Sequence, residues 1–196
     1  MFEVRIHGRG GQGVVTAAEL LSVAAVLEGR HAQAFPSFGS ERMGAPVVAY
    51  CRIDEREIRL REPVLEPDAL IVQDPTLLHQ VDVFSGLARD GYMLINTTRS
   101  FEELGIGEFV RSLEPAHRGT VPATELALEH VGRPVPNAAL LGGFAAITGR
   151  ITLESVCAAI RERFSGHVAE GNVAAATRAF EHVRRSREES IHAQAD

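Results

Sequence analysis

The residues best suited to chemistry lie near the start of the chain, where residues 7–13 read HGRGGQG and carry three glycines at GxGxxG spacing. A β-prone apolar run precedes this segment and a helix-like run follows it. Glycines let the backbone turn tightly and bring amide N–H groups to the N-terminus of the following helix, where a phosphate gains hydrogen bonds and a favourable dipole. A guanidinium at the second position adds a bidentate contact to such an anion. The motif therefore predicts a phosphate-binding loop formed by Gly8, Arg9, Gly10, Gly11, Gln12 and Gly13.

Two other interpretations of this motif stay open. A dinucleotide site needs an acidic residue at the end of the second strand, about 20 residues further on, to hold the ribose hydroxyls. Residues 33–37 read QAFPS and contain no carboxylate, Glu28 comes too early, and Glu41 lies in an irregular loop. The missing acidic residue thus weakens the interpretation of the motif as an NAD-binding site. The remaining alternative is a glycine turn that serves only the close packing of a strand on a helix.

A second loop, Phe35–Pro46, contains too many glycines and prolines to be regular. It follows a strand whose carboxyl end we expect beside the glycine loop, at the edge where ligands bind in doubly wound sheets. Ser37, Ser40 and Arg42 would then face the same phosphate-bearing ligand. The alternative is a simple surface ion pair between Glu41 and Arg42.

Polar residues also follow later strands. Asp74 and Asn96 each come directly after an apolar run, so we expect both on the same rim of the sheet, Asp74 as a helix cap and Asn96 as a turn residue. Asn137 is expected to cap a helix rich in alanine and glycine. The small residues of that helix predict close approach of another helix, either within the chain or across an interface.

The elements that must position these residues alternate along the chain. Apolar runs predict strands at 2–7, 31–35, 47–53, 69–73 and 92–95, with 57–60 as a hairpin partner of the third. Helical periodicity predicts helices at 14–28, 77–87, 122–130, 137–148, 152–164 and 170–187, whereas residues 99–115 show no clear pattern. This alternation predicts an α/β fold: a Rossmann-like, doubly wound, mostly parallel sheet with helices on both faces. We expect a single domain over residues 1–187, followed by a frayed tail at 188–196.

Composition narrows the function. The 196-residue chain has a net charge of −6 and a pI of about 5.8, which argues against a nucleic-acid surface. No apolar run approaches the roughly 18–20 residues of a membrane helix, and the first residues enter a strand rather than a signal peptide, so we expect a cytoplasmic protein. All 20 basic residues are arginine, which excludes lysine chemistry. Two distant cysteines, Cys51 and Cys157, cannot supply the four thiolates of an iron–sulfur cluster. We therefore expect no metal and no catalytic residue in this chain, and binding parts only.

Several ordered segments together resemble one family, the γ subunits of pyruvate and related 2-oxoacid:ferredoxin (flavodoxin) oxidoreductases. They are residues 4–18 (VRIHGRGGQGVVTAA), 34–47 (AFPSFGSERMGAPV), 74–78 (DPTLL), 91–97 (GYMLINT), 122–127 (PATELA) and 136–144 (PNAALLGGF). The resemblance covers about residues 2–180. It implies a subunit of an enzyme that oxidatively decarboxylates a 2-oxoacid with coenzyme A to acyl-CoA, carbon dioxide and reduced ferredoxin.

The resemblance also implies where the chemistry lies. Thiamine diphosphate, Mg²⁺ and 4Fe-4S clusters would be held by α, β and δ partner subunits, and the γ chain would contribute to coenzyme A binding through Gly8–Gly13, Ser37 and Arg42. Two positions depart from the family pattern: Met43 stands where arginine is expected, and Ser40 where proline is expected. The leading hypothesis is a γ-type subunit without catalytic activity alone. The alternative is a stand-alone NAD(P)-binding reductase or nucleotide sensor.

Overall fold

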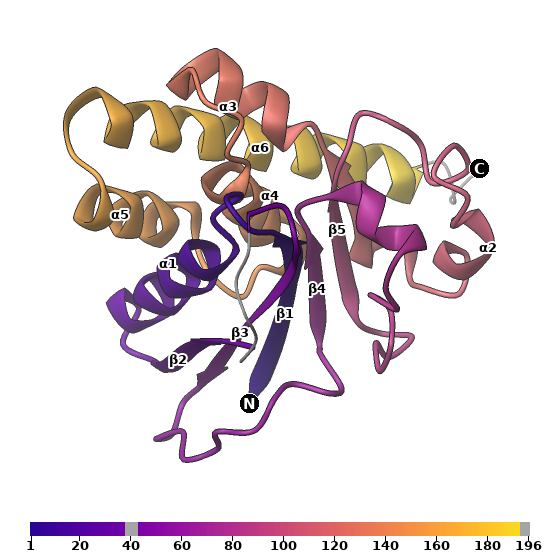
Figure 1. Cartoon of the computed structure of the whole chain (residues 1–196), viewed down its shortest axis with the longest axis horizontal. Coiled ribbons are helices and arrows are strands. Elements are labelled where there is room, and N and C mark those ends of the chain that lie inside the picture. Colours follow the sequence, from indigo (N-terminus) through magenta and orange to yellow (C-terminus); the bar gives the residue numbers. More distant parts are fainter. Residues whose placement is uncertain (38–42, 193–196) are drawn as a thin grey trace.

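The computed structural model describes residues 1–37 and 43–192, and these contain a six-stranded sheet in the order β2-β3-β1-β4-β5-β6 (Figure 1). The strands are β1 (Phe2–Arg9), β2 (His31–Pro36), β3 (Pro46–Asp54), β4 (Ala69–Val72), β5 (Tyr92–Asn96) and β6 (Arg118–Val121). Strands β1, β4, β5 and β6 pair in parallel, and β3 runs antiparallel to both of its neighbours. Because β2 and β1 both oppose β3, they run in the same direction. The expectation of a mostly parallel sheet is confirmed.

One face of the sheet carries the long helices: α1 (Val14–Leu27), α3 (Ala123–Val131), α4 (Asn137–Thr148), α5 (Leu153–Arg163) and α6 (Gly166–His192). Alternation in β1 sets this arrangement, since Val4 and Ile6 point into the main core under α1 and α4. The other face has a smaller core beneath the 3-10 helix η1 (Pro75–His79) and the short helix α2 (Gly107–Val110), where Leu70 and Met93 are buried. A second 3-10 helix, η2 (Pro115–His117), precedes β6. The fold is doubly wound, with unequal layers (Figure 1).

The expected elements need correction at four places. Residues 57–60 form no hairpin strand, and the helix expected at 77–87 is only the 3-10 helix η1 followed by irregular chain. Strand β6, which the sequence pattern did not indicate, completes the sheet. The helix expected to end at Arg187 begins earlier, at Gly166, and continues to His192. The expected tail at 188–196 therefore begins as helix within the described residues.

The small residues of α4 serve packing inside the chain. A methyl group added at Gly142 would collide with the backbone carbonyl of Ala176 in α6, so the two helix backbones touch at this point. Gly143, one residue on, faces the side chains of Leu94 and Val183. The question left open by the sequence is thus answered for this contact: the close approach is to α6.

The connections define where a ligand is expected. From β1 the chain crosses through α1 towards β2, whereas from β4 it crosses through η1 towards β5, on the opposite face and in the opposite direction. The strand order therefore reverses between β1 and β4. In open α/β sheets, the crevice at the carboxyl ends of two such strands is the usual ligand site. Both the glycine loop, after β1, and Asp74, after β4, lie at this point.

Candidate functional site: the glycine loop and its rim

The glycine loop delivers an uncapped helix N-terminus. Gly11 and Gly13 adopt left-handed backbone conformations, with φ of 93° and 73°, which favour glycine over any other residue. Gly13 is the N-cap of α1, and the first helical hydrogen bond runs from Ala17 N–H to the Gly13 carbonyl (2.9 Å). The amides of residues 14–16 therefore have no partner inside the helix. No side chain among the described residues caps them.

These free amides border a hollow of about 310 Å³. Its lining consists of Arg9, Gly10, Gly11, Gly13, Val14, Val15, Thr16 and Val47. The volume is at the lower end of the range for small-molecule sites. An anion placed here would meet unsatisfied N–H donors and the positive end of the α1 dipole, which is the physical basis of phosphate binding at helix N-termini.

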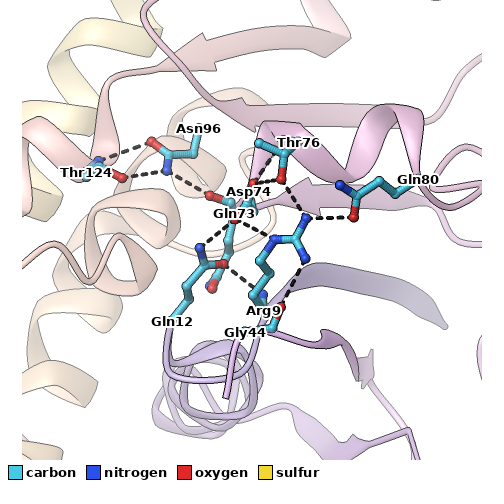
Figure 2. A network of polar contacts seen from close by, with 9 residues as sticks. All are labelled: Arg9, Gln12, Gly44, Gln73, Asp74, Thr76, Gln80, Asn96 and Thr124. Atoms are coloured by element: carbon cyan, nitrogen blue, oxygen red, sulfur yellow. Dashed lines mark hydrogen bonds and ion pairs between the residues drawn. The ribbon is translucent and has the colours of Figure 1, made fainter. Parts of the chain in front are cut away.

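The Arg9 side chain holds the loop against the end of β4 rather than projecting freely (Figure 2). Its Nε donates to Asp74 Oδ2 (3.1 Å), and one terminal nitrogen donates to Thr76 Oγ1 (2.8 Å) and Gln80 Oε1 (2.7 Å). The other terminal nitrogen donates to the Gly44 carbonyl (3.0 Å). Of the five guanidinium donors, one from Nε, two from the first terminal nitrogen and one from the second are engaged. The fifth donor has no partner among the described residues.

Asp74 is the centre of this network. Besides Arg9, its carboxylate accepts from Gln12 Nε2 (2.8 Å) and from the Thr76 amide (2.9 Å), which caps η1 as expected from the sequence. Partial burial alone would raise the pKa of Asp74, but hydrogen bonds from Thr76 and Gln12 and the charge of Arg9 outweigh it and hold that pKa below its ordinary value. Asp74 is therefore ionised at neutral pH and neutralises Arg9.

The same rim continues to β5 and β6. Asn96 Nδ2 donates to the Gln73 carbonyl (2.8 Å) and to Thr124 Oγ1 (2.8 Å), while Asn96 Oδ1 accepts from the Thr124 amide (3.1 Å) (Figure 2). Asp74 and Asn96 thus lie on the same rim of the sheet, as expected. Asn96 is not a turn residue: it is buried at the end of β5, and its side chain links the Gln73 carbonyl to Thr124. Gln73 differs from its neighbours. It is 1% exposed, and neither of its side-chain amide atoms has a partner in the described structure.

The second predicted loop returns to the glycine loop. Gly10 N–H donates to the Ala45 carbonyl (2.9 Å) and Gly44 N–H to the Gly10 carbonyl (3.1 Å). Met43 is 87% exposed, and its sulfur lies 2.6 Å from the position that a Cβ on Gly11 would occupy. Ser37 is exposed and does not line the hollow, and its amide donates to the Val48 carbonyl (2.8 Å). Arg42 and Ser40 lie outside the described residues.

Strand order explains why the dinucleotide alternative is weak. In an NAD-binding unit, the acidic residue ends the strand that lies next to the first strand. Here the strand beside β1 on that side is β3, which is antiparallel, so its amino end, Pro46–Val47, lies next to Gly8 and Arg9. Strand β2 is one position further out. The expectation that the end of β2 lies directly beside the glycine turn is corrected: both reach the same edge, but with β3 between them.

A second hollow, of about 250 Å³, adjoins the first and shares Gly11, Gly13 and Thr16 with it. The sequence reasoning found only one of its other residues, Asn137. That residue does not cap α4, as had been expected: Pro136 is the N-cap, and Asn137 instead places Nδ2 3.5 Å from the Gly13 carbonyl. The arginines of this hollow, Arg133 and Arg163, carried no sequence signal because each is an isolated residue next to a helix end.

On the face opposite the glycine loop, β1 buries two polar side chains. Arg5 Nε donates to His7 Nε2 (3.1 Å), and its terminal nitrogens donate to backbone carbonyls of two irregular segments, including Val64 (3.3 Å) and Val83 (3.1 Å). Burial, with the neighbouring charge of Arg5, lowers the pKa of His7 to about 4. His7 is therefore neutral at physiological pH. The Arg5 side chain thus connects these two segments to the sheet through hydrogen bonds.

The predicted binding residues divide into three groups. Arg9, Gly10, Gly11 and Gly13 line the first hollow. Gly8 and Gln12 lie in the loop beneath it, Gly8 packed against Val14 and Gln12 bonded to Asp74 and to the Arg9 amide (2.8 Å). In the third group, Ser37 is exposed and does not line the hollow, and Arg42 lies outside the described residues. The sequence reasoning predicted amides at the start of the helix but did not name residues 14–16, which line the hollow as well.

Over the parts of the chain that the structure describes, no three His, Cys, Asp or Glu side chains gather in a way that can hold a metal ion. Cys51 and Cys157 are free and buried. Burial raises the pKa of both thiols. None of the described helices is long and apolar enough to cross a membrane.

These features define an α/β domain in which a glycine loop and the start of a helix border a hollow at the carboxyl edge of the sheet. Comparison with known proteins is more specific. Residues 3–182 match the model of the pyruvate ferredoxin/flavodoxin oxidoreductase family. The chain is 50% identical over 181 residues to the pyruvate/ketoisovalerate oxidoreductases common subunit gamma of Pyrococcus abyssi, covering 92% of this chain and 96% of that one. It is 46% identical over 186 residues to pyruvate synthase subunit PorC of Methanothermobacter marburgensis, covering 95% and 99%.

Solved structures agree. The pyruvate oxidoreductase subunit PORC of Thermotoga maritima superimposes with a TM-score of 0.76 at 36% identity, covering 92% of this chain and 95% of that chain. The 2-oxoglutarate:ferredoxin oxidoreductase of Magnetococcus marinus matches 96% of this chain with 31% of its own length, at a TM-score of 0.72 and 16% identity, which shows a shared fold. The chain belongs to the pyruvate ferredoxin/flavodoxin oxidoreductase family. It is a γ-type subunit of such an oxidoreductase, as the sequence predicted.

Proposed function

We propose that this γ-type subunit supplies a coenzyme A-binding surface to an oxidoreductase assembled with α-, β- and δ-type subunits. The assembly oxidatively decarboxylates a 2-oxoacid such as pyruvate with coenzyme A. Thiamine diphosphate, Mg²⁺ and 4Fe-4S clusters belong to the partner subunits, and reduced ferredoxin is the electron product. The γ chain has no catalytic residue of its own and acts by holding the acyl acceptor and joining the assembly.

The observation that carries this proposal is the N-terminus of α1, which no side chain among the described residues caps and whose first residues line the hollow of about 310 Å³. A pyrophosphate fits this arrangement because backbone N–H groups donate to its oxygens and the helix dipole favours its charge. The hollow is too small for a whole coenzyme A molecule, so the remainder of the ligand extends beyond it. The M. marinus structure, which holds coenzyme A, contains the same fold.

Arg9 takes a different role from the one that the motif suggested. Its guanidinium is neutralised by Asp74, and four of its five donors are engaged (Figure 2). We therefore assign Arg9 and Gln12 to holding the loop in its binding conformation, with one Arg9 donor left for the phosphate. Ser37 and Arg42 remain proposed contacts from the neighbouring loop.

The test is calorimetric titration of coenzyme A into this chain and into the chain co-expressed with its partner subunits. Gly11→Val should weaken binding by about tenfold or more, because a side chain at φ 93° and against Met43 displaces the loop. Gly29→Val is the matched control: Gly29 has φ 80° at the other end of α1, with nothing within 4 Å. It carries similar backbone strain and should bind normally.

Two results would reject the proposal. One is the absence of coenzyme A binding by both the chain and the assembly. The other is tight binding of NAD or NADP by the chain, with no response to coenzyme A, which would restore the nucleotide-module alternative. Equal weakening in Gly11→Val and Gly29→Val would show that global strain, not the loop, controls binding.

A further inference from the structure

The second hollow has the chemistry of a phosphate site on an apolar floor. Its lining comprises Gly11, Gly13, Thr16, Val131, Arg133, Val135, Asn137, Arg163, Phe164, Val168 and Asn172. It lies between the start of α1, the segment joining α3 to α4, the end of α5 and the start of α6. None of these lining residues carries a carboxylate. In a chain with a net charge of −6, such a hollow is a local positive region.

Both arginines of this hollow lack a partner. Neither the Arg133 nor the Arg163 guanidinium makes a hydrogen bond or ion pair with any residue that the structure describes, and the guanidinium of Arg163 lies 6.0 Å from the ring centre of Phe164. Arg161, two residues earlier in α5, behaves differently, with bonds of 2.8 and 2.9 Å to Glu170. A free guanidinium at a concave surface matches the geometry of a phosphate, to which it can donate two parallel hydrogen bonds.

Two buried amide side chains support a ligand here independently of the arginines. Asn172 is 6% exposed and donates through Nδ2 to the Val168 carbonyl (2.9 Å), but its Oδ1 accepts from none of the described groups. Asn137 is 3% exposed, and its Nδ2 has only the long 3.5 Å contact to Gly13. Both side chains line the hollow, so Asn172 Oδ1 and Asn137 Nδ2 are available to hydrogen-bond a ligand bound in it.

We propose that the Arg133–Arg163 hollow binds the ribose 3′-phosphate of the same coenzyme A molecule whose pyrophosphate lies on the start of α1. This inference rests on the proposed function and assigns the orientation of the ligand. The 3′-phosphate and the 5′-pyrophosphate of coenzyme A are attached to one ribose ring, and the two hollows share Gly11, Gly13 and Thr16. One sugar can therefore span them. The apolar side chains of Val131, Val135 and Phe164 suit the adenine ring attached to the same ribose.

The experiment compares coenzyme A with dephospho-coenzyme A, which lacks only the 3′-phosphate, by calorimetry on the assembled complex and on the full γ chain. The wild type should bind coenzyme A at least about tenfold more tightly than dephospho-coenzyme A. Arg133→Gln and Arg163→Gln should each weaken coenzyme A by about tenfold and leave dephospho-coenzyme A unchanged, because a charge-assisted hydrogen bond to phosphate is lost. Arg161→Gln, the control on the same helix, should change neither affinity.

The outcomes separate the two proposals. If the wild type binds both ligands equally, or if the Arg133 and Arg163 variants weaken both ligands alike, the 3′-phosphate assignment is wrong while coenzyme A binding stands. If the wild type binds neither ligand in either preparation, the proposed function fails together with this inference.

Discussion

Substitution of Gly13 by alanine tests the geometry of the site most directly. Gly13 has φ 73°, and a Cβ there would lie 2.6 Å from Asn137 Nδ2 and 3.2 Å from Asn137 Cγ. The left-handed conformation costs an alanine about 1–2 kcal/mol, and overpacking against a buried side chain costs about 1–3 kcal/mol. Gly13→Ala should therefore lower the free energy of unfolding by about 2–5 kcal/mol. Gly149, which ends α4 with φ 61° and nothing within 4 Å, isolates the first cost.

Urea unfolding measures both. With a slope of about 2 kcal/mol per molar urea, Gly13→Ala should lower the unfolding midpoint by about 1–2.5 M, and Gly149→Ala by about 0.5–1 M. An Asn137→Ala background removes the colliding amide. There the cost of Gly13→Ala should fall to that of Gly149→Ala, because the two residues are in contact and their effects are not additive.

Equal midpoints for Gly13→Ala and Gly149→Ala would refute this reasoning. So would strict additivity of Gly13→Ala and Asn137→Ala. Either result would mean that Asn137 moves aside freely, and that the contact between the start of α1 and the start of α4 does not fix the glycine loop. The shared wall of the two hollows would then have no rigid support.

Three further predictions concern the buried polar groups and the close helix contact. The pKa of His7 is about 4 in the folded state, against about 6.5 in the unfolded chain, so the unfolded state binds the extra proton and stability should fall by up to about 3 kcal/mol as pH drops from 6.5 to 4. Urea unfolding across this pH range should show the loss, and His7→Gln should flatten it; an equally steep profile in the variant would count against the assignment. Gln73→Leu should be neutral or stabilising by about 1 kcal/mol in thermal unfolding, because both amide atoms are buried without a partner in the described structure, and a loss above about 2 kcal/mol would show that they are satisfied. Gly142→Ala should destabilise by more than about 3 kcal/mol through its collision with the Ala176 carbonyl, and similar unfolding midpoints for Gly142→Ala and Gly143→Ala would contradict the packing of α4 on α6.

The sequence predicted most elements because hydrophobic periodicity and caps are local signals. Thr152, for example, caps α5 by accepting from Ser155 N–H (3.1 Å), as its position suggested. The failures have a physical cause as well. The segment 77–87 carries helix-compatible residues, but its apolar side chains Leu77, Leu78 and Val83 fill the small core between the sheet and α2. Tertiary packing there outweighs weak helical propensity.

The sequence predicted where the candidate site lies, but not which strands and side chains surround it. Spacing alone located the glycine loop, because GxGxxG after a strand has a local backbone meaning. It could not show that β3 inserts between β1 and β2, since strand order depends on long-range pairing. Nor could it show that Asp74, 65 residues away, would occupy the Arg9 guanidinium. The partnerless Arg133 and Arg163 become significant only when α1, α5 and the α3–α4 segment are brought together.

The structure suggests why a chain without lysine suits this task. In the proposed coenzyme A site, the donors of the first hollow are backbone amides, whose positions are fixed once Gly11 and Gly13 take their left-handed conformations. Arg9 holds that loop because its planar fork can reach Asp74, Thr76 and the Gly44 carbonyl simultaneously, which a lysine ammonium cannot do with the same directionality. The network lies entirely within the chain, so the proposed binding does not require the ligand to order the loop. The role proposed above, in which the subunit presents a long, flexible ligand to chemistry on partner chains, needs this rigidity at the phosphate end, because only then does the remainder of the ligand extend from a fixed point.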